Sequence, residues 1–122
     1  MVTRGLNKVM LIGNLGGDPE MRYTPSGIPV TSFSIGVTRN WVTSNGERKD
    51  ATEWFNVVAW RNLAEICKQY LSNGSRVYIE GRLQTRSWED REGQRHYRTE
   101  VVASDMVLLD ARPEGKGEES FP

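Results

Sequence analysis

Between positions 53 and 61 the chain reads Glu53-Trp54-Phe55-Asn56-Val57-Val58-Ala59-Trp60-Arg61. Side chains of a β-strand alternate between its two faces, so Phe55, Val57 and Ala59 share one face. Trp54 and Trp60 lie on the other face. A small domain with a single sheet can bury one of these faces in its core. The aliphatic face with Phe55 suits that core, and the two indoles suit an exposed, flat surface.

The other two of the four tryptophans, Trp41 and Trp88, stand near the ends of further predicted strands, each with an arginine two positions earlier. Indole faces stack on unpaired bases at about 1–3 kcal/mol per base, with little sequence preference, while guanidinium groups hold phosphates. The combination indicates binding of a single nucleic-acid strand. The alternative is that some of these indoles fill the core or a subunit interface. The predicted stacking residues are Trp41, Trp54, Trp60 and Trp88.

Basic side chains on the same faces, and in the hairpins beside them, are the predicted phosphate contacts. The chain has 16 Lys and Arg against 16 Asp and Glu, so its formal net charge is zero. A neutral chain that binds a polyanion must concentrate its positive charge on one surface. The residues predicted to do so are Arg4, Arg22, Arg39, Lys49, Arg82, Arg86, Arg91 and Arg98.

Length and composition predict one soluble domain, with 122 residues of which 37% are hydrophobic and 26% charged. No apolar run approaches the roughly 18 residues that cross a bilayer, and no signal peptide opens the chain, so we expect no membrane partner. The single cysteine, Cys67, excludes an internal disulfide and a multi-cysteine zinc site, and it fits a reducing cytosol. We therefore expect a cytoplasmic protein.

Sequence signatures of enzymes are missing: a glycine-rich phosphate loop, a serine elbow, a paired-cysteine motif and a zinc-binding histidine helix. Two acidic clusters could in principle hold a divalent cation, namely Asp18 with Glu20, and the segment from Glu89 to Glu92. The second cluster lies among arginines, which favours a solvated, self-neutralising loop. The single histidine, His96, is predicted to be exposed in a turn. We expect no catalysis, no metal and no cofactor.

Apolar periodicity predicts five strands and one helix. The helix covers 62–71, with Asn62 as its N-cap and Tyr70 among the apolar residues at helical spacing. Five strands with one helix between the third and the fourth are the element order of an oligonucleotide-binding (OB) barrel, an all-β fold with one helix. Other small β-barrels and half-open sandwiches fit the pattern nearly as well. The predicted strands are 7–13, 30–39, 52–61, 76–88 and 96–109.

The last part of the chain differs in composition from the rest. From Asp110 to Pro122 it is rich in Arg, Pro, Glu, Gly and Lys and has no apolar periodicity. Such a stretch cannot bury enough surface to order itself. We therefore expect a nucleic-acid-binding domain over residues 1–109 and the start of a disordered tail over residues 110–122.

A series of short motifs runs through the domain: Arg4-Gly5-Leu6-Asn7-Lys8-Val9, Gly13-Asn14-Leu15-Gly16, Asp18-Pro19-Glu20, Thr52-Glu53-Trp54, Leu63-Ala64-Glu65, Gly74-Ser75-Arg76-Val77-Tyr78-Ile79-Glu80-Gly81 and Thr99-Glu100-Val101-Val102. In order and spacing, these motifs resemble the bacterial single-stranded DNA-binding protein family. The resemblance covers roughly residues 4–109, nearly the whole predicted domain.

The resemblance implies an OB barrel assembled as a homotetramer, around which single-stranded DNA wraps during replication, recombination and repair. The family's stacking aromatics fall on the four tryptophans named above, and the third of them, Trp60, is usually phenylalanine. By the same pattern some residues lie at subunit contacts instead of on the DNA path. The first predicted strand adds to that surface because it is apolar on both faces. The predicted interface residues are Lys8, Val9, Met10, Leu11, Tyr78 and Glu80.

Family members usually carry a linker and an acidic tip, finished by proline and phenylalanine, that recruits replication and repair proteins. This chain finishes with Glu118-Glu119-Ser120-Phe121-Pro122, in which the last pair is reversed. A short or truncated tail is therefore expected, and partner recruitment falls on no residue here. Two rival interpretations stay open. A primosomal relative on the same barrel would not need four stacking tryptophans, and an RNA-binding barrel of cold-shock type would be shorter, with clustered phenylalanines.

Overall fold

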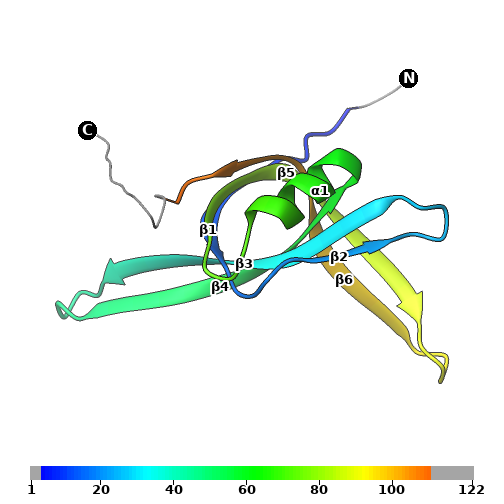
Figure 1. Ribbon diagram of the computed structural model, residues 1–122. Coiled ribbons are helices and arrows are strands. Elements are labelled where there is room, and N and C mark those ends of the chain that lie inside the picture. The colour runs from blue at the N-terminus through cyan, green and yellow to red at the C-terminus, as the bar shows by residue number, and fades with distance from the viewer. Residues whose placement is uncertain (1–3, 111–122) are drawn as a thin grey trace.

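The computed structural model describes residues 4–110 (Figure 1). The predicted tail from residue 111 onward lies outside the described residues, as do residues 1–3. The elements in chain order are β1 (Val9–Leu15), β2 (Glu20–Tyr23), β3 (Pro29–Val42), β4 (Arg48–Trp60), α1 (Arg61–Tyr70), β5 (Arg76–Glu89) and β6 (Arg95–Leu108).

Five of these strands close into a barrel. β1 pairs with β5 on one side and with β3 on the other. β3 continues to β4, β4 runs parallel to β6, and β6 returns to β5. The helix α1 connects β4 to β5, the third and fourth strands of this ring. The predicted OB barrel is confirmed. The short β2, which adds to β3, was not predicted, because four residues are too few for an alternating pattern to show.

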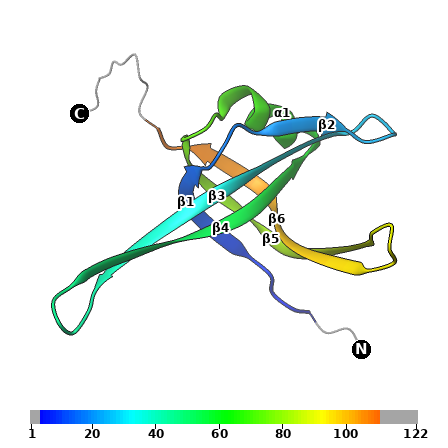
Figure 2. The ribbon, with the colours of Figure 1, turned by 90° about the horizontal axis from the view of Figure 1, so that it is seen from below.

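Two long hairpins extend past the barrel in different directions (Figures 1 and 2). The β3–β4 hairpin turns at Gly46, with φ of 85°, and the β5–β6 hairpin turns at Gly93, with φ of 82°. Glycine adopts such angles without a steric penalty. β4 begins at Arg48, four residues before the predicted start. Cross-strand pairing, including a 2.8 Å hydrogen bond between the hydroxyls of Thr38 and Thr52, stabilises the polar outer part of this hairpin, which does not pack on the core.

The core fills the barrel beneath α1. Val57, on the inward face of β4, is fully buried, as the alternation predicts. Ala64 and Cys67 of α1 are also fully buried against the strands. The Thr31 hydroxyl donates a 2.7 Å hydrogen bond to the carbonyl oxygen of Ala64 and so ties the helix to β3. The core cluster comprises Leu15, Phe33, Ile35, Val57, Ala59, Cys67, Leu71, Val77, Ile79, Val101 and Ala103.

The start of α1 differs from the prediction. The helix begins at Arg61, and Trp60 occupies the N-cap position without a side-chain hydrogen bond, so the prediction of an Asn62 cap is wrong. Arg61 has φ of 62°, a left-handed conformation that turns the chain from strand into helix. Tyr70 is 57% exposed instead of packed, because Leu71, just past the helix, takes the core position. Among residues 4–110 there is no helix long and apolar enough to cross a membrane.

Candidate nucleic-acid interface

All four tryptophans present ring surface to solvent. On β4, Trp54 is 60% exposed and Trp60 is 42% exposed, whereas Val57 on the opposite face is buried. Trp41 of β3 and Trp88 of β5 are 39% and 41% exposed. The outward orientation of the two β4 indoles follows from strand alternation, as predicted. Each of the four rings therefore keeps area available for contact with a ligand.

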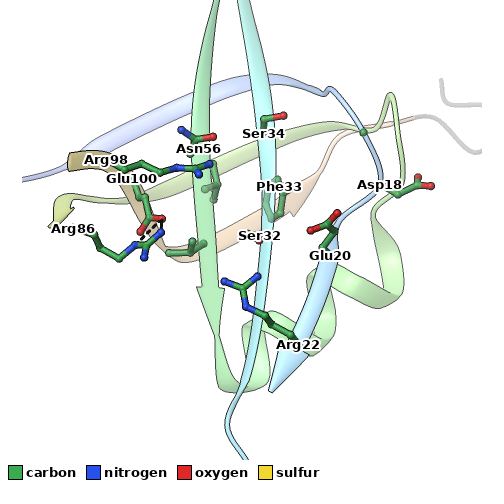
Figure 3. Close-up of a pocket in the computed structure, with 13 residues that line it drawn as sticks. Asp18, Glu20, Arg22, Ser32, Phe33, Ser34, Asn56, Arg86, Arg98 and Glu100 are labelled. Atoms are coloured by element: carbon green, nitrogen blue, oxygen red, sulfur yellow. Dashed lines mark hydrogen bonds and ion pairs between the residues drawn. The ribbon is translucent and has the colours of Figure 1, made fainter. Parts of the chain in front are cut away.

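A groove with a volume of ≈ 340 Å³ lies over β4, between β2 and the base of the β5–β6 hairpin (Figure 3). Asn56 and Val58, which stand between Trp54 and Trp60 on the outward face of β4, both line it. A smaller adjoining hollow of ≈ 180 Å³ shares Val58 with the groove and reaches Trp60. The charged residues along the groove are Asp18, Glu20, Arg22, Arg86, Arg98 and Glu100.

Arginines from three strands meet at this groove: Arg22 of β2, Arg86 of β5 and Arg98 of β6 (Figure 3). Arg86 and Arg98 are direct cross-strand partners. Like charges at such a position destabilise a sheet unless they are balanced or meet an anionic ligand. Within residues 4–110, neither Arg22 nor Arg98 forms an ion pair. These two guanidinium groups are therefore available to an anion in the groove.

Arg86 is held differently. Its Nε and Nη2 atoms donate to Oε2 of Glu100 at 3.1 and 3.0 Å, and the Glu100 side chain is only 5% exposed. The Arg86 guanidinium also lies 5.5 Å from the ring centre of Trp88. Its charge is thus already paired, which leaves less of it for a phosphate than the sequence suggested. Glu100 was not among the predicted site residues, because its partner lies 14 positions away and the strand register is invisible in the sequence.

The β5–β6 hairpin carries a second cluster, around Trp88. His96, its cross-strand partner, stacks on it with ring centres 5.6 Å apart and planes inclined by 23°. His96 Nε2 lies 2.7 Å from Oδ2 of Asp90. The hydrogen bond from His96, and then the backbone N–H of Gln94, hold the pKa of the Asp90 carboxyl below its usual value. His96 was predicted to be merely exposed in a turn; instead it links Trp88 to the end of the hairpin.

The β3–β4 hairpin carries Trp41. The Arg39 guanidinium lies 4.5 Å from the ring centre of Trp41, within cation–π distance. Lys49 faces Trp41 across the hairpin and sits 3.7 Å from Glu47. An aromatic ring with two cations beside it therefore extends the basic and aromatic surface away from the barrel, along an arm separate from the groove.

Comparison with known proteins identifies the family. The model described as "Single-strand binding protein family" matches residues 6–109. The chain belongs to this family. The Single-stranded DNA-binding protein 1 of Chlorobaculum tepidum is 52% identical over 117 residues, which are 95% of this chain and 72% of that protein. A solved structure described as Plasmodium falciparum SSB in complex with ssDNA superposes with a TM-score of 0.80 at 34% identity, covering 90% of this chain and 100% of that one.

Membership in the single-strand binding protein family confirms the resemblance drawn from the motifs. Because the family consists of DNA-binding proteins, it also confirms the prediction that the chain is not an enzyme. The described part of this family member, residues 4–110, holds no group of three or more His, Cys, Asp or Glu placed to bind a metal ion.

Burial raises the pKa of the Cys67 thiol to about 11, so this cysteine is protonated near neutral pH and inert as a nucleophile.

Five of the predicted phosphate contacts lie away from the groove, including Arg39 and Lys49 of the β3–β4 hairpin. Arg4 is exposed in the segment before β1, and Arg91 is exposed in the β5–β6 turn. Arg82 lines a separate hollow with Lys8 and Glu80, near the outer side of β1. The structure thus brings together some of the predicted basic residues, and their contacts with phosphate stay a prediction.

The predicted subunit interface lies on the outer side of β1 and β5. The Lys8 ammonium pairs with Glu80 at 2.7 Å, and the Tyr78 hydroxyl donates to Glu80 at 2.6 Å. These two bonds hold the pKa of the Glu80 carboxyl down, whereas the hydrogen bond that the Tyr78 hydroxyl donates to Glu80 raises the pKa of the phenol. Val9 and Leu11 do not belong to this outer side, because alternation along β1 turns them inward, where they pack against the core.

Proposed function

We propose that this family member binds single-stranded DNA with little sequence preference and protects it during replication, recombination and repair. The observation that carries the proposal is the set of four exposed indoles. Trp54 and Trp60 lie on β4 beside a groove lined by Arg22, Arg86 and Arg98, and Trp41 and Trp88 lie on the two long hairpins. Family membership and the structural likeness to a protein solved with single-stranded DNA support it. Double-stranded DNA hides its base faces, so exposed indoles suit an unpaired strand.

Different residues bind the bases and the phosphates of the strand. Bases stack on Trp41, Trp54, Trp60 and Trp88, whereas phosphates meet Arg22 and Arg98, which form no ion pair within residues 4–110. Arg4, Lys49, Arg82 and Arg91 extend the basic surface outward. Arg39 and Arg86 hold their tryptophans and add charge beside the stacked bases.

Stacking carries a large share of the affinity. Each phosphate neutralised contributes about −0.7 to the slope of log affinity against log salt for a single strand. The chain has zero formal net charge, so we expect a shallower slope than a strongly basic relative would show. Base stacking supplies the part of the affinity that salt does not remove.

A titration with oligo-dT tests the proposal. Tryptophan fluorescence is followed at low and at moderate salt, and we expect strong quenching that saturates near stoichiometric DNA. Absence of binding at low salt would reject the function. Equal affinity for the matching RNA strand would favour the cold-shock type of protein instead.

Single substitutions test the stacking residues. We expect Trp54→Ala and Trp88→Ala each to weaken binding about 5- to 150-fold, the loss of one stacked base. Tyr70→Ala is the control, because Tyr70 is an equally exposed aromatic on α1, outside the groove. If the two tryptophan variants unfold instead, their exposed orientation is wrong. If Tyr70→Ala weakens binding as much, the effect is not specific to the proposed stacking residues.

We further propose a homotetramer around which the strand wraps, in the cytoplasm with the nucleoid. An apolar row on the outer side of the barrel supports self-association: Ile12 pairs in register with Tyr78, and Tyr78 with Val107. Met10, also on this side, is 64% exposed. Light scattering should give four subunits for the wild type and fewer for Met10→Arg, with Tyr70→Arg unchanged. A wild-type monomer would reject the assembly.

Recruitment of replication and repair proteins through a C-terminal tail belongs to the same proposal. The segment concerned lies outside the described residues, so the support for it is family membership alone.

A further inference from the structure

Trp54 is the most exposed of the four tryptophans, yet one side of its ring is covered by backbone. A Cβ atom added at Gly16 would lie 2.5 Å from Cζ3 and 2.9 Å from Cη2 of the indole. A Cβ added at Gly36 would lie 2.9 Å from each of these two atoms. Carbon atoms in contact are normally about 3.5–4.0 Å apart. The benzene edge of Trp54 therefore occupies the space that a side chain at either position would need.

Neither glycine is required by its own backbone conformation. Gly46 and Gly93 have positive φ angles and form turns, but Gly16 and Gly36 are not among the residues with positive φ. A strand glycine without a positive φ, such as Gly36, often marks a place where another group approaches closely, and the same steric reasoning applies to Gly16 just after β1. For both glycines the nearest group is the indole of Trp54, and a Cβ at Gly36 would also lie 3.1 Å from Cγ2 of Thr52.

The two glycines come from different segments that the barrel holds in place. Gly36 of β3 is the direct cross-strand partner of Trp54. Gly16 lies between β1 and β2, and its N–H donates a 3.0 Å hydrogen bond to the Ser34 carbonyl oxygen of β3. The surface under the ring is thus made of hydrogen-bonded main chain, which moves less than a side chain would.

We propose that Gly16 and Gly36 are positioning residues of the DNA-binding surface. They form a seat on which the indole of Trp54 lies, so that its opposite face is presented in one fixed orientation to a single base. The inference rests on the proposed function and deepens it. A methyl group at either position would lift the ring from the main chain and tilt the stacking face.

Gly16→Ala and Gly36→Ala test the seat, and Gly5→Ala is the matched control. A Cβ at Gly5 would have nothing within 4 Å, and Gly5 has no positive φ. We expect Gly16→Ala and Gly36→Ala each to weaken oligo-dT binding about fivefold or more, up to the loss of one stacked base. Gly5→Ala should bind as the wild type does. Circular dichroism checks that each variant is folded. If Gly36→Ala does not fold, because this position lies inside a barrel strand, Gly16→Ala alone still tests the inference.

A double-mutant cycle with Trp54→Ala separates the seat from a general effect on the fold. Removing the indole leaves room for the methyl group, so Gly16→Ala should cause no further loss of affinity in the Trp54→Ala background. If Gly16→Ala weakens binding by the same factor with and without Trp54, the methyl acts elsewhere and the inference is overturned.

A measurement without DNA distinguishes failure of the seat from failure of the function. The indole N–H resonance of Trp54 should shift in Gly16→Ala and stay in place in Gly5→Ala. A wild type that does not bind oligo-dT rejects the proposed function, whatever this resonance does. A wild type that binds, with Gly16→Ala leaving both resonance and affinity unchanged, rejects the seat alone.

Discussion

Trp54 and Trp88 are both exposed on the same molecule, but different chemistry holds each of them. Trp54 lies over the main chain at Gly16 and Gly36, on the wall of the barrel. Trp88 stands on a hairpin that extends past the barrel, with Arg86 and His96 against its ring. The Trp54 indole is positioned against the main chain at two glycines, and the Trp88 indole is positioned by the charged Arg86 and the ionisable His96.

This difference has consequences for how the two indoles respond to change. Backbone hydrogen bonds in a closed barrel depend little on salt or pH, so Trp54 should keep its orientation as long as the domain is folded. The support of Trp88 depends on two carboxylates, Glu100 behind Arg86 and Asp90 behind His96. Changes to those carboxylates or their partners should therefore alter the orientation of Trp88 and leave that of Trp54 unchanged.

The largest effect is expected for Arg86→Met, which removes one support of Trp88. The Glu100 side chain is 5% exposed and would lose its cationic partner in the interior. We expect the free energy of unfolding to fall by about 3 kcal/mol, the usual effect of leaving a buried charge unpaired. Urea denaturation measures it, and the indole resonance of Trp88 should move while that of Trp54 does not.

Glu100→Gln is the matched comparison for that variant. The Arg86 side chain is 48% exposed and can be solvated when its partner loses its charge, so we expect a smaller loss, about 1 kcal/mol. Equal losses for the two variants would mean that Glu100 is not the buried member of the pair, and the account of how Trp88 is held would then be wrong.

The two indoles also differ in how far the sequence could predict them. Strand alternation is a local property, and it was enough to place Trp54 and Trp60 on the outward face. The core residues of β4, the five barrel strands and the position of the helix follow from the same periodicity. The covering of Trp54 by Gly16 could not be predicted, because it depends on the path of the segment between β1 and β2.

The surroundings of Trp88 escaped prediction for a related reason. The contacts of Arg86 with Glu100, and of His96 with Trp88, join residues on opposite strands of a hairpin, and their register is fixed by the turn at Gly93. Val9 and Leu11 show the converse case. A continuous apolar run predicts burial on both faces but not which residues face the core.

Trp60 provides a third case, in which the backbone beside the indole is strained. Arg61 follows it with φ of 62°. The left-handed conformation costs a non-glycine residue about 1–2 kcal/mol, and glycine in its place gives back part of this through its greater freedom when unfolded. We expect Arg61→Gly to raise the free energy of unfolding by about 0.5–1 kcal/mol, as measured by urea denaturation.

Asn62→Gly serves as the control for Arg61→Gly. Asn62 lies in α1 and is not among the residues with positive φ, so glycine there should lower the free energy of unfolding by a few tenths of a kcal/mol to about 1 kcal/mol. A loss of stability in both variants would show that the conformation of Arg61 is not strained.

The smallest effect is expected at the end of the β5–β6 hairpin, on acidification. The hydrogen bond from His96 lowers the pKa of Asp90 in the folded chain. Because the pKa of Asp90 is lower in the folded than in the unfolded chain, its carboxylate stabilises the hairpin fully at a pH above its unfolded-state pKa, which is about 4. This stabilisation is lost as the pH falls through the folded-state pKa of Asp90. Below that range we expect the Trp88 indole resonance to shift before the resonance of Trp54 does, because Asp90 reaches Trp88 through His96. In Asp90→Asn this early shift should be absent. If the resonances of both indoles instead change together at every pH, the hairpin unfolds together with the barrel. Asp90 and His96 would then not stabilise Trp88 independently of the barrel.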